Sequence, residues 1–160
     1  MKKFKFINWL LVFAAIFCLS ACSVFSDTDR LDKELPASSA GVTAIEEDKS
    51  YTSKDEVAAY IQKFSKLPGN FVTKSEAKKA GWDPGENYLS DVLPGFSIGG
   101  DRFGNYEELL PEADGRKWKE CDINYKSGRR GAERIVYSND GLIYYTGNHY
   151  KSFEELTGKD

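Results

Sequence analysis

The chain has 160 residues, of which 41% are hydrophobic and 29% charged, and this composition excludes a chain that is disordered throughout. Its formal net charge is −3, and residues 1–21 hold three lysines and no acidic residue, so the remainder is more acidic still. Because an acidic protein repels nucleic acids at long range, a nucleic-acid-binding role requires a local cluster of basic residues.

The first 21 residues have the features of a signal peptide. Lysines among residues 1–5 precede an apolar stretch, residues 6–19, that is shorter than the ~20 residues of a membrane span. Residues 19–22, Leu-Ser-Ala-Cys, resemble the lipobox of bacterial lipoproteins, which implies cleavage before Cys22 and lipidation of its sulfur. The alternative is an ordinary signal peptide that is cleaved nearby. We expect an extracellular or cell-envelope protein that is lipid-anchored or released.

Residues 22–50 are predicted to form a flexible linker, because they are polar and acidic and hold no aromatic residue after Phe25. A folded domain is then expected over residues 51–160. Its one cysteine, Cys121, cannot form an internal disulfide, and we expect a buried, unreactive thiol there.

Three helices are expected in the first half of that domain. Residues 53–56 have the pattern of a capping box, and apolar residues then recur at helical spacing until residues 67–69, Leu-Pro-Gly, end the helix. A second capping box over residues 73–76 opens a short helix that ends near Gly81. Residues 87–92 are predicted to form a third helix.

The second half has the two-residue period of β-strands. Side chains alternate along residues 118–125, and two more strands are expected over residues 134–137 and 142–145, on either side of an Asp-Gly turn. Helices followed by a strand meander predict an α+β fold, with N-terminal helices packed on a C-terminal antiparallel β-sheet. Residues 97–107 are rich in glycine and are predicted to form a loop that a ligand can approach closely, although a turn without function is the alternative.

One histidine and two carboxylates are candidates for acid–base chemistry. His149 is the one histidine of the chain, and histidine changes its protonation state near neutral pH. A lone histidine is more often structural, so its neighbours decide. Glu120 and Asp122 point to the same face of the strand predicted over residues 119–125.

These carboxylates lie within a local cluster of positive charge. Residues 116–134 carry three acidic and seven basic residues, the basic ones being Arg116, Lys117, Lys119, Lys126, Arg129, Arg130 and Arg134. The cluster is either a solvated charged surface or a phosphate site that encloses a carboxylate base.

Seven segments between about Ser53 and Leu156 occur in the order found in a known family. They are residues 66–68 (Lys-Leu-Pro), 72–77 (Val-Thr-Lys-Ser-Glu-Ala), 81–82 (Gly-Trp), 97–101 (Ser-Ile-Gly-Gly-Asp), 120–125 (Glu-Cys-Asp-Ile-Asn-Tyr), 134–135 (Arg-Ile) and 149–150 (His-Tyr). In these segments the chain resembles the barnase and binase family of guanyl-specific bacterial ribonucleases. The resemblance implies the microbial ribonuclease fold.

The resemblance also implies a reaction on RNA. Glu120 would be the general base that removes the proton from a ribose 2′-OH, and His149 the general acid that protonates the departing 5′-oxygen, which leaves a 2′,3′-cyclic phosphate. Three cations would stabilise charge on the phosphoryl oxygens and one carboxylate would orient the arginines; these residues are Lys74, Arg130, Arg134 and Asp122. No metal ion and no cofactor is implied.

A site for guanine is implied as well, formed by Phe103, Gly104, Asn105, Tyr106, Glu107 and Tyr150. Loop amides would bind guanine O6 and N7, and Glu107 would accept hydrogen bonds from N1–H and the 2-amino group. Tyr106 stands where the family has an arginine, and an aromatic ring there can stack on a base. The partners implied are RNA and a small acidic inhibitor of the barstar type, with a membrane reached through the lipid on Cys22 alone. We expect a monomer.

Two other functions remain open. One is an RNA- or nucleotide-binding lipoprotein of the same fold with little or no turnover, and the other is a structural lipoprotein of the cell envelope. Binding alone needs no acid–base pair, so the presence of both Glu120 and His149 favours the enzyme.

Overall fold

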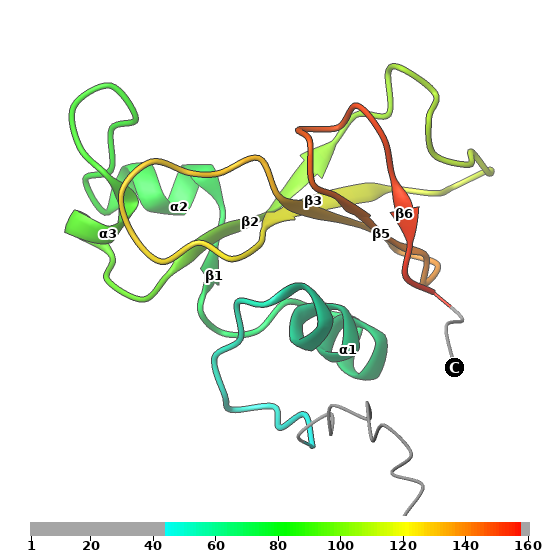
Figure 1. The fold of residues 1–160 in the computed structure, drawn as a ribbon, viewed down its shortest axis with the longest axis horizontal. Helices are drawn as coiled ribbons and strands as arrows, with labels where there is room; N and C mark the ends of the chain where they lie inside the picture. The colour runs from blue at the N-terminus through cyan, green and yellow to red at the C-terminus, as the bar shows by residue number, and fades with distance from the viewer. Residues whose placement is uncertain (1–43, 158–160) are drawn as a thin grey trace, which may run out of the picture. The chain divides into compact units, whose positions relative to one another are not determined.

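The computed structural model describes residues 44–157 (Figure 1). Every described residue belongs to one compact unit. The predicted signal peptide, Cys22 and most of the predicted linker therefore lie outside the described residues. Within residues 44–157, no helix is both long enough and apolar enough to cross a membrane.

Three helices and six strands build the fold. In chain order they are α1 (Lys54–Phe64), β1 (Phe71–Val72), α2 (Lys74–Lys79), α3 (Leu89–Val92), β2 (Ser97–Phe103), β3 (Trp118–Asp122), β4 (Arg134–Ser138), β5 (Ile143–Thr146) and β6 (Glu154–Glu155). The strands form one sheet in the order β1-β2-β3-β4-β5-β6. The α+β fold predicted from the sequence is confirmed. One detail differs, because β1 pairs with β2 in parallel while the other pairs are antiparallel.

The first two helices begin at the predicted caps. The Ser53 side chain accepts a hydrogen bond from the Glu56 N–H at the start of α1, and Thr73 and Glu76 form a complete capping box at the start of α2. Such bonds satisfy amides that have no partner within a helix, which is why four residues suffice to predict the start. The third helix is shorter than predicted and covers only Leu89–Val92.

Two predictions about strands are wrong: one strand ends earlier than predicted, and another was predicted as a loop. β3 ends at Asp122 rather than continuing to residue 125, because Asn124 adopts a left-handed backbone conformation (φ 58°) and its N–H donates to the Thr52 carbonyl. Residues 97–103, predicted as part of a loop, form β2. There a Cβ on Gly99 would lie 2.6 Å from Cys121 Cβ, so glycine permits the close approach of β2 to β3.

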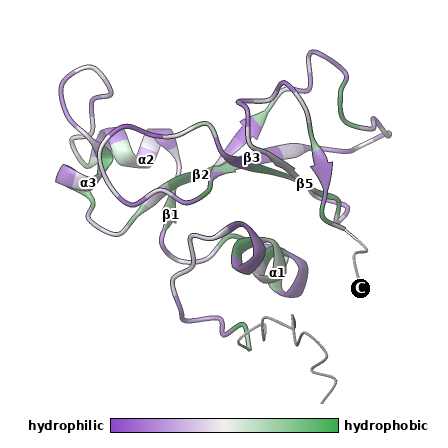
Figure 2. Cartoon of the chain, viewed as in Figure 1, coloured by the Kyte–Doolittle hydropathy of each residue, from purple (hydrophilic) through white to green (hydrophobic). Residues whose placement is uncertain are grey.

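The sheet is covered on both faces by apolar side chains. On one face, Val57, Tyr60 and Ile61 of α1 pack on residues of β3, β4 and β5, including Ile135. Figure 2 shows apolar stretches along β1, β2 and β5, and both polar and apolar residues around α1. On the other face, a smaller cluster centres on Leu110, Trp118 and Val136.

The folded part begins before Tyr51, where the sequence predicted its start. Ile45 is 7% exposed and belongs to the core cluster beneath α1. Lys63 Nζ donates to the Ile45 carbonyl at 2.7 Å, and the Tyr60 hydroxyl donates to the Glu47 carbonyl at 2.9 Å. The last residues of the predicted linker are therefore packed against α1.

Candidate active site

The candidate catalytic carboxylates lie on the face of the sheet that points away from α1. Cys121 packs in the cluster under α1, so its neighbours Glu120 and Asp122 on β3 face the opposite way. Arg134 of β4 pairs directly across from Asp122, which puts it on the same face. Cys121 is buried as predicted, and burial raises the pKa of its thiol.

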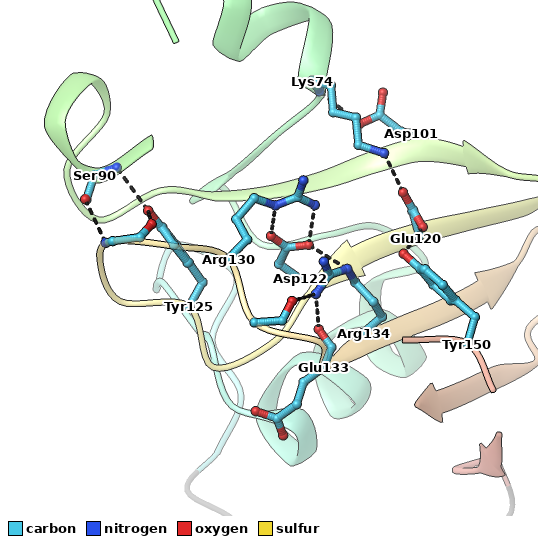
Figure 3. A network of polar contacts seen from close by, with 12 residues as sticks. Lys74, Ser90, Asp101, Glu120, Asp122, Tyr125, Arg130, Glu133, Arg134 and Tyr150 are labelled. Atoms are coloured by element: carbon cyan, nitrogen blue, oxygen red, sulfur yellow. Dashed lines mark hydrogen bonds and ion pairs between the residues drawn. The ribbon is translucent and has the colours of Figure 1, made fainter. Parts of the chain in front are cut away.

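Glu120 is held by a hydrogen-bond donor at each carboxylate oxygen (Figure 3). Lys74 Nζ lies 2.7 Å from Oε1, and the Tyr150 hydroxyl lies 2.5 Å from Oε2. Burial alone would raise the pKa of Glu120, but the bonds from Lys74 and Tyr150 and the charge of Arg134 outweigh it and lower the pKa. Glu120 is therefore ionised at neutral pH, as a proton acceptor must be.

Lys74 reaches Glu120 because α2 starts beside β2. The Lys74 N–H donates to Asp101 Oδ2 at 2.9 Å, and Asp101 pairs with Glu120 across β2 and β3. A β-bulge between Gly99 and Asp101, with Gly100 at φ 93°, sets this register. Asp101 is thus a positioning residue for Lys74, a role that sequence analysis did not assign.

Asp122 lies between two arginines. Its Oδ1 is 2.7 Å from Arg130 Nη2 and 2.9 Å from Arg134 Nε, and its side chain is 3% exposed. Burial would lower the pKa of Arg130, but the bonds to Asp122 outweigh it and raise the pKa. Asp122 therefore fixes the direction of both guanidinium groups, an arrangement suited to binding a phosphate.

The loop between β3 and β4, residues 123–133, carries Arg129 and Arg130, and we call it the arginine loop. The Tyr125 hydroxyl donates to the Gly128 carbonyl at 3.1 Å and accepts from the Ser90 N–H at 3.1 Å. The Gly128 N–H donates back to Ser90 Oγ at 3.3 Å. These bonds fasten the arginine loop to α3, and the sequence contained no local signal for them.

His149 is exposed in the turn after β5. His149 and Tyr150 both have left-handed backbone conformations, with φ of 56° and 69°, which cost energy for residues other than glycine. The His149 N–H donates to the Ala132 carbonyl and the Tyr150 N–H donates to Thr146 Oγ1. The ring centroids of His149 and Tyr150 are 4.8 Å apart, so the imidazole stands beside the tyrosine that holds Glu120.

His149 and the predicted guanine-binding residues other than Asn105 line one groove. Its volume is about 500 Å³, and its walls include Phe103, Gly104, Tyr106, Glu107, His149 and Tyr150. Phe103 belongs to β2 rather than to the loop, and it packs on Tyr150 with ring centroids 5.2 Å apart. We call residues 104–109 the base loop.

Two residues of the base loop have hydrogen-bond partners within the protein. Asn105 closes the loop, since its side chain donates to the Leu110 carbonyl at 2.8 Å and accepts from the Leu110 N–H at 3.0 Å. The Tyr106 N–H donates to the Gly104 carbonyl at 2.8 Å, so that amide already has an acceptor. The Tyr106 side chain is 91% exposed.

These residues together form a cationic site with three basic side chains, in which Glu120 pairs with Lys74 and Asp122 pairs with two arginines. Lys74, Arg130 and Arg134 provide the positive charge, and a groove with aromatic walls adjoins it. Among residues 44–157, no group of three or more His, Cys, Asp or Glu side chains is placed to hold a metal ion. The arrangement can bind a phosphodiester, accept a proton at Glu120 and stabilise negative charge on phosphoryl oxygens.

Comparison with known proteins gives consistent matches. A family profile described as ribonuclease matches residues 54–157. A ribonuclease of Heyndrickxia coagulans is 51% identical over 102 residues, which cover 64% of this chain and 94% of that protein. Ribonucleases of Bacillus intermedius and Bacillus pumilus are each 51% identical over 102 residues, covering 64% of this chain and 63% of their own length.

Proposed function

Because the chain belongs to the ribonuclease family, as the resemblance had implied, we propose that it is an endoribonuclease that cleaves single-stranded RNA on the 3′ side of guanine. The reaction proposed is a transphosphorylation that needs neither a metal ion nor a cofactor. The observation that carries the proposal is Glu120, ionised and hydrogen-bonded to Lys74 and Tyr150, beside two arginines fixed by Asp122.

The proposed first step is an in-line displacement at phosphorus. Glu120 accepts the proton of the ribose 2′-OH, and the 2′-oxygen forms a bond to the adjacent phosphorus. The bond from phosphorus to the 5′-oxygen of the next nucleotide breaks, and His149 gives that oxygen its proton. The products are a 2′,3′-cyclic phosphate and a free 5′-hydroxyl, with Glu120 protonated and His149 neutral.

The cations are proposed to stabilise the transition state. Lys74, Arg130 and Arg134 are charged groups within contact of Glu120 or Asp122, so they surround the position of the reacting phosphate. Preorganised charges of this kind stabilise the negative charge that develops on phosphoryl oxygens. Asp122 acts through the arginines as a positioning residue.

Guanine preference is proposed for the groove at the base loop. Glu107 lines this groove and can accept hydrogen bonds from N1–H and the 2-amino group of guanine, a donor pair that adenine lacks. Tyr106 is exposed beside it and offers a ring for stacking on the base. Loop amides other than that of Tyr106 would bind O6 and N7.

Export and lipid attachment at Cys22 are proposed from the sequence of the signal region alone. A variant with Cys22→Ser should lose incorporation of labelled fatty acid and appear in the medium instead of the membrane fraction. Labelling of the Cys22→Ser variant equal to that of the natural chain would contradict lipid attachment. We further propose that the protein is a monomer and that a small acidic inhibitor binds over the cationic site.

The test is cleavage of single-stranded oligoribonucleotides that contain one guanosine, compared with adenosine at the same position. We expect cleavage only after guanosine, a 2′,3′-cyclic phosphate as first product, and no effect of a chelator. An oligonucleotide with 2′-deoxyguanosine at that position should bind without being cut, because it lacks the nucleophile.

Each outcome has a definite meaning. Cleavage lost with chelator would contradict the metal-independent reaction, and cleavage after every base would contradict the guanine site. Binding without any cleavage would favour the RNA-binding lipoprotein over the enzyme.

A further inference from the structure

A second pocket lies between the α2–α3 segment and the arginine loop, outside the groove assigned to the base. Its volume is about 220 Å³, and the residues on its walls that matter here are Trp82, Asn87, Tyr88, Gly128, Arg129 and Arg130. Nothing in the reaction proposed above uses Tyr88 or Arg129.

The walls of this pocket combine aromatic rings with positive charge. The guanidinium carbon of Arg130 lies 5.9 Å from the centre of the Trp82 ring. Tyr88 is 51% exposed and Arg129 is exposed. Stacking surfaces beside cations are the features that bind single-stranded nucleic acid without regard to sequence.

The exposure of Tyr88 is unusual within residues 44–157. Three large hydrophobic side chains are exposed there, and the other two, Tyr106 and Leu109, line the groove assigned to guanine. An exposed tyrosine on the wall of a pocket offers its ring for stacking on a base. Tyr88 is therefore an exposed tyrosine on the wall of the second pocket, as Tyr106 is on the wall of the groove.

Arg130 links the second pocket to the catalytic site. It lines the pocket and also bonds to Asp122, which pairs with Arg134. Figure 3 shows Arg130 between the Ser90–Tyr125 pair on one side and Glu120 on the other. The base groove adjoins Glu120 through Tyr150, so the pocket and the groove flank the position of the reacting phosphate.

The second pocket is held open by bonds within the protein. Ser90 and Tyr125 fix the arginine loop at Gly128, and the Tyr88 N–H donates to Asp91 Oδ2 at 3.0 Å. Binding there requires little ordering of the chain, which favours affinity.

We propose that this pocket binds one nucleotide of single-stranded RNA outside the dinucleotide that contains the cleaved bond. The base of this nucleotide stacks on Tyr88, and its phosphate faces Arg129. Since stacking accepts every base, the pocket adds affinity for length rather than for sequence. This inference rests on the proposed ribonuclease reaction.

The test measures kcat/KM of the purified protein for a guanosine-containing dinucleotide and for two hexanucleotides that extend it on the 5′ or the 3′ side. The natural chain should prefer at least one hexanucleotide. Tyr88→Ala should reduce that preference about tenfold, whereas Tyr88→Phe, which keeps the ring, should retain it.

A charge variant gives a second readout. Arg129→Gln should reduce the salt dependence for the preferred hexanucleotide, making the slope of log kcat/KM against log salt concentration shallower by about 0.7. Lys66→Gln removes an exposed positive charge just after α1 and is the matched control, with no change in slope expected.

The outcomes separate this inference from the proposed function. The dinucleotide could be cleaved while the natural chain and Tyr88→Ala show the same preference for the hexanucleotide. That result would contradict binding in the pocket without contradicting the proposed reaction. If no substrate is cut, fluorescence anisotropy with a labelled hexanucleotide containing 2′-deoxyguanosine tests binding in the pocket independently of cleavage. A Kd raised about tenfold by Tyr88→Ala would support it, and an unchanged Kd would overturn it.

Discussion

The two faces of β3 and β4 are both buried, but they differ in chemistry. On the face toward α1, Cys121 and Ile135 pair across the strands and pack in an apolar core. One residue further along, Asp122 and Arg134 pair on the opposite face and are 2% and 4% exposed. A single step along each strand thus separates the apolar core from the charged residues that are proposed to bind the phosphate of RNA.

The two faces differ in the free energy that burial of their residues costs. Burying an ion pair costs desolvation that an apolar pair does not, so the Asp122–Arg134 pair is weak as a source of stability. Two of the five non-glycine residues with positive φ in the described part of the chain, His149 and Tyr150, lie on the same side as this pair. Strain and buried charge that coincide in this way are typical of functional sites.

The largest expected effect is on turnover. Glu120→Gln keeps the shape of the side chain and removes the proton acceptor, so kcat on the guanosine dinucleotide should fall about 10³-fold with little change in KM. His149→Ala should have a loss of similar size. Glu47→Gln, an exposed glutamate on the α1 side, is the control. A loss below about tenfold in either catalytic variant would contradict the assigned roles.

Removing the charge of Asp122 should destabilise the fold. In Asp122→Asn the two arginines lose their buried counter-charge, and the free energy of unfolding measured with urea should fall by about 3–5 kcal/mol. A loss below about 1 kcal/mol would mean that water already compensates these charges.

A change on the apolar face should lower the stability of the fold without lowering activity. Ile135→Val removes one buried methylene from the core under α1 and should cost about 0.5–1.5 kcal/mol of unfolding free energy. Because this side chain faces away from the cationic site, kcat/KM should stay that of the natural chain. A drop in kcat/KM would show that the two faces are not independent.

Two substitutions at His149 sharpen the argument about strain. His149→Gly and His149→Ala both remove the proposed acid, but glycine adopts the observed φ of 56° without penalty. The glycine variant should therefore be more stable than the alanine variant by about 1 kcal/mol in urea unfolding. Equal stabilities would mean that the turn relaxes when the imidazole is removed.

Helices and strands differed in how far the sequence predicted them. Four residues suffice to predict the start of α1 and of α2, because the capping bonds of Ser53 and Thr73 join residues three apart in sequence. β2 was missed because its glycines are typical of loops, and the reason for Gly99, its contact with Cys121, joins residues distant in sequence.

In the site, as in the fold, local patterns were predicted and contacts between residues distant in sequence were not. The common face of Glu120 and Asp122 follows from the two-residue period, whereas the pairing that puts Arg134 on this face was not predicted. The bonds of Glu120 to Lys74 and Tyr150 span 46 and 30 residues, so no local pattern contains them. Asp101 and the Ser90–Tyr125 pair were missed for the same reason.

The central claim is that the charged face is one site in which Glu120 acts as an ionised base. Its folded-state pKa is lowered, so the ionised form adds stability above the unfolded-state pKa, and this stability is lost as pH falls through the folded-state pKa. The acid limb of activity should follow the same folded-state pKa.

The most direct test is the pH dependence of kcat/KM on the guanosine dinucleotide for the natural chain and Tyr150→Phe. Removing the hydroxyl removes one bond that lowers the pKa of Glu120, so the acid limb should move to higher pH in the variant. The natural chain should lose activity only below the ordinary pKa of a glutamate. An acid limb at the same pH in both proteins would contradict the account.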